Sequence, residues 1–281
     1  MSTVSDAIFC YLKNSAEFTA HGRKISTEKF SSRFCRWNGG GPRRLQTARK
    51  RTGRRRIEFA VVREPLERFL SGFVDKCLHE KQCYSCNGDM GCFVSKLTTS
   101  LFRYYRDENS SSDFHLDHFA PQNCLFGHPF VMSAQSMMGF SISPNDTRWI
   151  TNDTIVYMVK AEQRGKSTRP PTHCNFRYSL NDFRIIKYES GREGAVKLAK
   201  EFRTIFRKAG VPTEMRNIIY NEMSIGRSHH STYGLEERQT AEQTLMSNFT
   251  LLTSVLRLFY YDYVIFGFKL PDVFRNHSTF S

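Results

Sequence analysis

Residues 56–77 read RIEFAVVREPLERFLSGFVDKC, and this stretch predicts a buried strand, a turn and an amphipathic helix. Ile57–Val62 is a short run of strand-forming residues broken only by Glu58, which is typical of an inner strand. Pro65 stands where the first turn of a helix tolerates a missing N–H. The apolar residues after it keep helical spacing: Leu66, Phe69, Leu70, Phe73, Val74 and Cys77.

Arg63 falls between the predicted strand and the predicted helix. Ligands of open α/β sheets bind beyond the carboxyl ends of strands, and helix N-termini favour anions, so this arginine predicts an anion site. A guanidinium also offers paired, charge-assisted hydrogen bonds to a phosphate. The alternative is that Arg63 only forms an ion pair with Glu64 or Glu67 and binds no ligand.

The size and composition indicate one large or two small folded domains. The chain has 281 residues, of which 40% are hydrophobic and 14% aromatic, which excludes global disorder. We find no run of about 18 apolar residues and no signal-peptide pattern, so no transmembrane helix is expected within the chain as given.

Much of the net charge of +14 comes from one segment. Its basic residues are Arg43, Arg44, Arg49, Lys50, Arg51, Arg54, Arg55 and Arg56. Three interpretations compete: a solvated loop, a nucleic-acid or nuclear-localisation patch, and a surface for an anionic polysaccharide. Aromatic residues, which single-stranded nucleic-acid binders use for stacking, are absent from this segment, so we expect no nucleic-acid partner.

The cysteines allow either disulfides or a zinc cluster. Among eight cysteines, Cys83, Cys86 and Cys92 lie close together with Cys77 nearby, but no second CxxC or HxxxH at finger spacing accompanies them. Glycosylation sequons begin at five asparagines: Asn109, Asn145, Asn152, Asn248 and Asn276. They favour a secretory route, and therefore disulfides over a cytosolic zinc site.

Hydrophobic periodicity predicts further elements. The predicted helices cover the first residues of the chain, a segment from Cys92, Glu193–Ala209 and a long pattern over Leu235–Phe268. The predicted strands are Thr154–Lys160 and Arg184–Tyr188.

Two histidines, His115 and His118, lie in the segment DFHLDHFAPQNC. Histidine is the usual general base near neutral pH. The alternative is that both are structural or simply exposed.

The string VREPLERFLSGF resembles the 3′-phosphate-binding segment of sulfotransferases that use 3′-phosphoadenosine 5′-phosphosulfate (PAPS). The resemblance implies that Arg63 and Ser71 hold the 3′-phosphate. Met1–Val4 looks like the tail of the turn that binds the 5′-phosphosulfate in this family, which implies that Ser2 and Thr3 belong to the same nucleotide site. We therefore expect a lysine, a first strand and a membrane anchor upstream of Met1.

The segment HFAPQNC resembles a stretch of the carbohydrate sulfotransferases that modify chondroitin-like chains, a family with nematode members. This resemblance implies that His118 is the catalytic base, with His115 as the second candidate. Two later segments, CNFRYSLNDFRIIKYES and HSTYGLEER, are similar to that family as well, and His230, Ser231 and Thr232 of the second are expected near the nucleotide.

The resemblance implies an α/β, P-loop-like sulfotransferase fold with a central parallel sheet flanked by helices, in which we expect the first strand to be missing. We expect a single domain over residues 1–281, with a basic loop at 36–56 and an atypical insertion at 124–173. The implied activity is sulfuryl transfer from PAPS, without a metal, to a glycosaminoglycan of the chondroitin type. The implied location is the Golgi lumen, as a type II membrane glycoprotein.

Three alternatives stay open at this point. The first is a catalytically inactive relative that binds glycans or nucleotide. The second is a basic nucleic-acid-binding protein that uses residues 43–56. The third is a zinc module built on Cys77, Cys83, Cys86 and Cys92.

Overall fold

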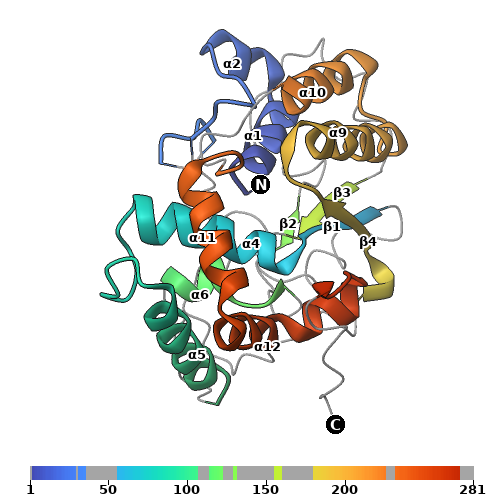
Figure 1. Cartoon of the computed structure of the whole chain (residues 1–281). Coiled ribbons are helices and arrows are strands. Elements are labelled where there is room, and N and C mark those ends of the chain that lie inside the picture. Colours follow the sequence, from blue (N-terminus) through green and yellow to red (C-terminus); the bar gives the residue numbers. More distant parts are fainter. Residues whose placement is uncertain are drawn as a thin grey trace. The chain divides into compact units, whose positions relative to one another are not determined.

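The computed structural model of the chain (Figure 1) describes residues 2–29, 31–35, 56–106, 114–122, 129–131, 155–159, 180–225 and 232–272. The chain divides into two units, which are described separately below. Unit 1 comprises Met1–Val61, Phe126–Arg164 and Ser179–Tyr233, and unit 2 comprises Val62–Leu125, Gly165–Tyr178 and Gly234–Ser281.

Unit 1 contains a four-stranded sheet with the strand order β2-β3-β1-β4. The strands are β1 (Arg56–Arg63), β2 (Pro129–Val131), β3 (Ile155–Val159) and β4 (Arg184–Tyr188). Strands β1 and β3 run parallel, with Ile57 opposite Val156. The predicted strands at residues 57–62, 154–160 and 184–188 are therefore confirmed. The expected central parallel sheet is present in part: β1 and β3 are parallel, whereas β2 pairs antiparallel with β3, as edge strands of mixed sheets often do.

The helices of unit 1 are α1 (Ser2–Lys13), α2 (Ser15–Ala20), α9 (Gly191–Lys208) and α10 (Thr213–Ile225), with a short 3₁₀ turn, η4 (Leu180–Asp182). Helices α1 and α9 confirm two of the predicted helices. Figure 1 shows α9 beside α10. The core of this unit joins strand and helix side chains, and the rings of Phe59 in β1 and Phe202 in α9 lie 5.3 Å apart. The apolar residues of β1 are therefore buried or partly buried: Phe59, Ala60 and Val62 are buried, and Ile57 and Val61 are partly buried.

Apart from Val62 and Arg63 at the end of β1, the regular elements in the described residues of unit 2 are helices. Its helices are α4 (Pro65–Gly72), the π-helix η1 (Phe73–His79), α5 (Met90–Arg106), α6 (Phe114–Phe119), α11 (Glu236–Ser247) and α12 (Phe249–Phe266). Helix α4 contacts α6, α11 and α12. The centre of the core is aromatic and contains Phe69, Phe73, Phe93, Phe119 and Phe259. These rings hold α4 in place, and α4 carries several candidate functional side chains.

Two predicted helices are each divided in the structure. The pattern that begins at Leu66 continues as a π-helix after Gly72, and the pattern over 235–268 breaks at Asn248. The Asn248 side chain accepts a hydrogen bond from the Leu251 amide at 3.0 Å. Asparagine is among the preferred residues at a helix N-terminus, because this bond satisfies an otherwise unpaired N–H. A new helix therefore begins where hydrophobic periodicity alone predicts continuation.

The cysteines in the described residues form disulfides. The pairs are Cys10–Cys35 in unit 1, and Cys77–Cys83 and Cys86–Cys92 in unit 2. The zinc module is therefore wrong as proposed, because zinc binding needs these sulfurs as thiolates. Disulfides are typical of proteins that fold in the secretory pathway. Cys124 and Cys174, like most of the basic segment 36–56, lie outside the described residues.

Helix α12 is long and apolar enough to cross a membrane by length and composition, with 18 residues and a mean hydropathy of 1.2. The sequence did not indicate this, because Arg257 and Asp262 interrupt the apolar run. Asp262 is fully buried and hydrogen-bonded to the Gln122 amide, and one face of α12 belongs to the core of unit 2. These features are typical of a core helix.

Replacing Gly72 by alanine is expected to lower the free energy of unfolding by about 1–3 kcal/mol, because the added methyl group overpacks the core at this point. A Cβ at Gly72 meets Cε1 of Phe119 at 2.9 Å, and that ring is buried. Gly91→Ala is the matched control, because its new Cβ meets only an Asp89 oxygen at 3.4 Å. Chemical denaturation of both variants measures the difference. Equal stability of the two would contradict the prediction.

Candidate active site

The turn between β1 and α4 has the predicted form. Arg63 ends the strand, Glu64 is the N-cap of α4, and Pro65 is its first residue. The Glu64 carboxylate accepts a hydrogen bond from the Glu67 amide at 2.6 Å. A carboxylate at this position satisfies a free N–H and complements the helix dipole. The local sequence REPLE is therefore sufficient to explain why the helix starts at this residue.

The side chain of Gln122 is hydrogen-bonded to both backbone groups of Arg63. The Arg63 amide donates to Oε1 of Gln122 at 2.8 Å, and Nε2 of Gln122 donates to the Arg63 carbonyl at 2.6 Å. This side chain occupies the place that a neighbouring strand would otherwise take. The backbone N–H of Gln122 in turn donates a hydrogen bond to Oδ2 of buried Asp262 at 2.7 Å. Arg63 is therefore positioned by a chain of hydrogen bonds that reaches buried Asp262 in α12.

The guanidinium of Arg63 faces the carboxylate of Glu67. Nη2 of Arg63 lies 3.3 Å from Oε2 of Glu67, and Nη2 of Arg238 lies 2.7 Å from Oε1. The ion pair of Arg63 with Glu67 that the alternative named is thus present. It does not exclude an anion site, because a long, partly exposed ion pair contributes little free energy and a phosphate can compete for the guanidinium. Arg238 is the buried partner and holds Glu67 in place.

Glu64 has a second partner in α12. The phenol of Tyr263 donates a hydrogen bond to Oε1 of Glu64. Burial, followed by the negative charge of Glu64 and this hydrogen bond, raises the pKa of Tyr263 far above its usual range. The phenol therefore remains a donor at every physiological pH, and the N-cap carboxylate stays tied to α12.

Arg68 connects α4 to the segment that carries the histidines. Its guanidinium donates to the Ala120 carbonyl at 2.8 Å and to the His118 carbonyl at 2.7 Å. Both carbonyls lie at the C-terminal end of α6, where helix carbonyls have no partner within the helix. Arg68 therefore fixes the position of the His118 backbone relative to α4, the helix that follows Arg63.

The two histidines have different surroundings. The His118 ring is half-buried and tilted against the Phe114 ring, with the centroids 4.4 Å apart, and its Nδ1 lies 2.7 Å from the Phe114 carbonyl oxygen. In the neutral ring this contact requires a proton on Nδ1, so Nε2 is the basic nitrogen. The His115 ring is buried and lies 3.8 Å from the ring of Tyr84. This arrangement suits His118 for proton transfer and gives His115 a packing role.

Lys76 of η1 lies near Phe114, the residue that contacts the His118 ring. Its ammonium is 5.8 Å from the centroid of the Phe114 ring, which also contacts the His118 ring. Burial opposes the charge of Lys76, but the hydrogen bonds and charges of Glu80 and Asp75 outweigh it and raise the pKa of Lys76. The surroundings of Phe114 therefore include a permanently charged lysine.

The remaining predicted site residues fall in both units. Ser71 is half-buried on α4 in unit 2, the unit that also contains Arg63, His115 and His118. Ser2 and Thr3 form the start of α1 in unit 1. Unit 2 thus brings the Arg63 turn and His118 into one hydrogen-bonded frame. Of the residues expected near the nucleotide in HSTYGLEER, His230 and Ser231 lie outside the described residues and Thr232 is buried.

Sequence reasoning missed the residues that position the others. Gln122 and Arg68 lie inside the strings that indicated the family, HFAPQ and REPLER, but their spacing does not reveal that they bind backbone groups. Asp262 and Arg238 had a weaker signal, which was a charged residue within a segment of otherwise apolar or helical pattern. None of the described residues form a cluster of three or more potential metal ligands.

Comparisons with known proteins assign the chain to a family. A profile of the sulfotransferase family matches residues 1–151, so the chain belongs to the sulfotransferase family. This membership implies use of PAPS and is consistent with enzyme activity. No solved structure matches the chain significantly.

Three relatives come from Caenorhabditis elegans. An uncharacterised protein is 23% identical over 98% of this chain and 65% of its own length. The carbohydrate sulfotransferase chst-1 is 23% identical over 95% of this chain and 70% of its own length. The putative sulfotransferase vep-2 is 22% identical over 83% of this chain and 60% of its own length. The chain thus spans between 60% and 70% of the length of these relatives.

Replacing Gln122 by methionine is expected to lower the free energy of unfolding by about 1–3 kcal/mol, because the partly buried N–H and C=O of Arg63 lose their partner. Methionine preserves most of the side-chain volume, so the loss reports hydrogen bonding. The same variant is expected to weaken nucleotide binding through misplacement of Arg63. Denaturation and calorimetry measure both effects. Wild-type values for both would show that Gln122 does not position Arg63.

Proposed function

We propose that this protein transfers a sulfuryl group from PAPS to a sugar hydroxyl of a glycosaminoglycan, most directly chondroitin. Family membership supports the donor, and the relative named a carbohydrate sulfotransferase supports the class of acceptor. The resemblance of HFAPQNC to enzymes that modify chondroitin-like chains supports the choice of polymer. The observation that carries the proposal is the frame built on α4, in which Gln122 holds Arg63 and Arg68 holds the His118 segment.

Arg63 and Ser71 are proposed to hold the 3′-phosphate of the nucleotide. Their surroundings fit such a group, because Arg63 lies at a strand end where the N-terminus of α4 adds favourable dipoles. When no phosphate is present, the Arg63 guanidinium donates a hydrogen bond to the Glu67 carboxylate. Ser2 and Thr3, in the first turn of α1, are proposed to bind the 5′-phosphosulfate.

His118 is proposed to take the proton of the acceptor hydroxyl at Nε2. In this reaction a bond forms between the sugar oxygen and sulfur, and the bond between sulfur and the bridging oxygen of the nucleotide breaks. The 3′-phosphoadenosine 5′-phosphate (PAP) product leaves with that oxygen. The Phe114 carbonyl fixes the ring of His118 and the proton on Nδ1. By analogy with phosphoryl transfer, positioning and charge stabilisation supply most of the rate.

The proposed location is the Golgi lumen, reached through the secretory pathway that the disulfides indicate. The net charge of +14 favours a polyanionic acceptor through salt-sensitive contacts.

A transfer assay tests the proposal directly. The full-length protein is produced in a secretory host and given radiolabelled PAPS with chondroitin, dermatan, heparosan or RNA. Label is expected on chondroitin and absent from RNA, with binding that weakens as salt increases. Binding of PAP without transfer to any polymer would indicate the catalytically inactive relative. Absence of both binding and transfer would contradict the proposal.

A further inference from the structure

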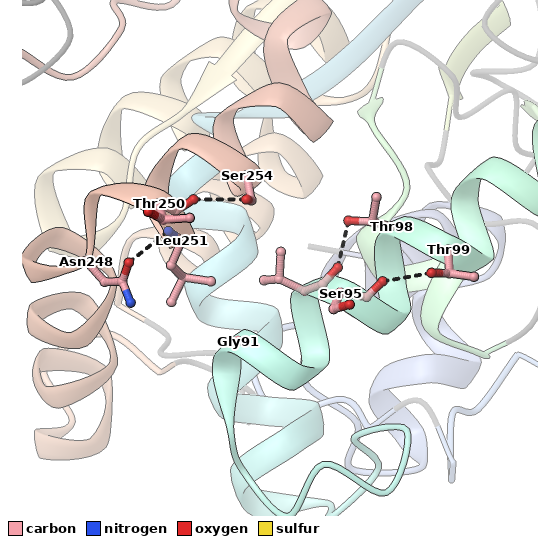
Figure 2. Close-up of a pocket in the computed structure, with 9 residues that line it drawn as sticks. Gly91, Ser95, Thr98, Thr99, Asn248, Thr250, Leu251 and Ser254 are labelled. Carbon is pink, nitrogen blue, oxygen red and sulfur yellow. Dashed lines mark hydrogen bonds between the residues drawn. The ribbon is translucent and has the colours of Figure 1, made fainter.

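One glycosylation sequon lies in a well-described part of the chain, between α11 and α12. It consists of Asn248, Phe249 and Thr250, and all three residues are exposed. Oδ1 of Asn248 accepts a hydrogen bond from the backbone amide of Leu251, so this side chain has a defined orientation (Figure 2). An N-linked glycan attaches to the amide nitrogen Nδ2, whereas the cap uses the oxygen. Capping of α12 and glycosylation of Asn248 are therefore compatible.

A hollow with a volume of about 470 Å³ lies next to this asparagine. Its lining comes from α5 and from the start of α12, and comprises Gly91, Val94, Ser95, Thr98, Thr99, Asn248, Thr250, Leu251 and Ser254 (Figure 2). The lining contains no charged side chain. A neutral ligand therefore fits this hollow better than a sulfated polymer or a nucleotide.

The hydroxyls around the hollow favour a ligand that donates hydrogen bonds. Thr98 donates to the Val94 carbonyl at 2.7 Å, Thr99 to Ser95 at 3.1 Å, and Ser254 to Thr250 at 2.9 Å. Because each hydroxyl proton is used within its helix, the hydroxyl oxygens remain as acceptors. The hydroxyls and acetamide of a sugar supply donors, and Val94 and Leu251 offer apolar contact to the face of its ring.

We infer that Asn248 carries an N-linked glycan, and that its first N-acetylglucosamine lies in the hollow between α5 and α12. The bond from Nδ2 to C1 of the sugar forms as the bond from C1 to a lipid-linked pyrophosphate breaks. The amide releases one proton, and the lipid pyrophosphate leaves. This inference depends on the secretory route and not on the sulfuryl-transfer chemistry.

Peptide mapping tests the modification. The full chain from a secretory host is treated with peptide N-glycosidase in oxygen-18 water and then with trypsin, which releases residues 239–257. We expect this peptide to contain labelled aspartate at position 248. Recovery of unmodified Asn248 from the folded, secreted protein would overturn the inference.

Three variants separate the effect of the glycan from that of the helix cap. Asn248→Asp keeps a capping oxygen but cannot be glycosylated, and it equals the chain left by the glycosidase. Thr250→Ala removes the sequon, whereas Thr250→Ser keeps it. We expect Asn248→Asp and Thr250→Ala to lose one glycan by gel mobility, and Thr250→Ser to retain it. Retention of that glycan by Asn248→Asp would place it on another asparagine.

Trimming the glycan tests whether the first N-acetylglucosamine lies in the hollow. An endoglycosidase leaves a single N-acetylglucosamine on Asn248, and we expect this form to keep the Tm of the intact glycoprotein and its slow hydrogen exchange in α5. Complete removal, or Asn248→Asp, is expected to lower Tm by several degrees and to speed exchange in α5. A trimmed form that behaves like Asn248→Asp would show that the sugar does not occupy the hollow.

Discussion

Replacing His118 by alanine is expected to lower the turnover number of sulfuryl transfer by about 10²- to 10⁴-fold, the usual contribution of a positioned general base. PAP affinity should remain unchanged, because the proposed phosphate contacts come from Arg63 and Ser71. The loss should appear in kcat and leave KM for PAPS near the wild-type value, since the proton is transferred only in the chemical step. Initial rates with labelled PAPS and calorimetry with PAP measure these two effects.

His79→Ala provides the matched control, because His79 is exposed on η1 in the same unit. It should keep wild-type turnover. His115→Phe should also keep most activity, since His115 packs against aromatic rings and a phenyl ring preserves that packing. Normal turnover of His118→Ala would exclude His118 as the base. Loss of turnover in His115→Phe, with its stability intact, would move the role to His115.

Replacing Arg63 by alanine is expected to weaken PAP binding by about 100-fold or more, which corresponds to the loss of about 3 kcal/mol of charge-assisted hydrogen bonding. Stability should change less than affinity, because the Arg63 backbone still pairs with Gln122 and its side-chain ion pair with Glu67 is long. Arg63→Lys keeps the charge but loses the planar fork, so it should bind PAP with intermediate affinity.

Arg257→Ala is the control for Arg63→Ala, because Arg257 is exposed on α12. It should bind PAP with wild-type affinity. Thermal unfolding of both variants establishes that they remain folded. Unchanged calorimetric affinity in a folded Arg63→Ala protein would eliminate this turn as the nucleotide site, and the family assignment would then have to rest on other segments.

Most of the helices and strands followed from local chemistry. The strand–proline–helix segment at 56–77 and the strand Arg184–Tyr188 were predicted because apolar period and proline position act over a few residues. The antiparallel pairing of β2 and the break at Asn248 were not predicted. A partner strand distant in sequence determines the first, and a single side-chain hydrogen bond outweighs hydrophobic periodicity in the second.

The candidate site divides in the same way. Arg63 and the two histidines could be named from residue type and motif, because phosphate binding and proton transfer each admit few side chains. The choice of His118 over His115 gained its physical support from packing, since His115 is buried against Tyr84. The shared frame of Arg63 and His118 depends on Gln122, Arg68 and Asp262, whose bonds connect residues between about 50 and 140 positions apart in the chain.

The sequence by itself determined the identity of the turn between β1 and α4, because the Glu64 cap, the Pro65 ring and the apolar stripe are encoded within about one turn of one another. It also determined the resemblance to the sulfotransferases. Only the tertiary structure decided that Arg63 and His118 belong to one hydrogen-bonded frame, because backbone groups removed from water must find partners wherever the fold brings them. In this protein those partners are Gln122 for Arg63 and Arg68 for His118.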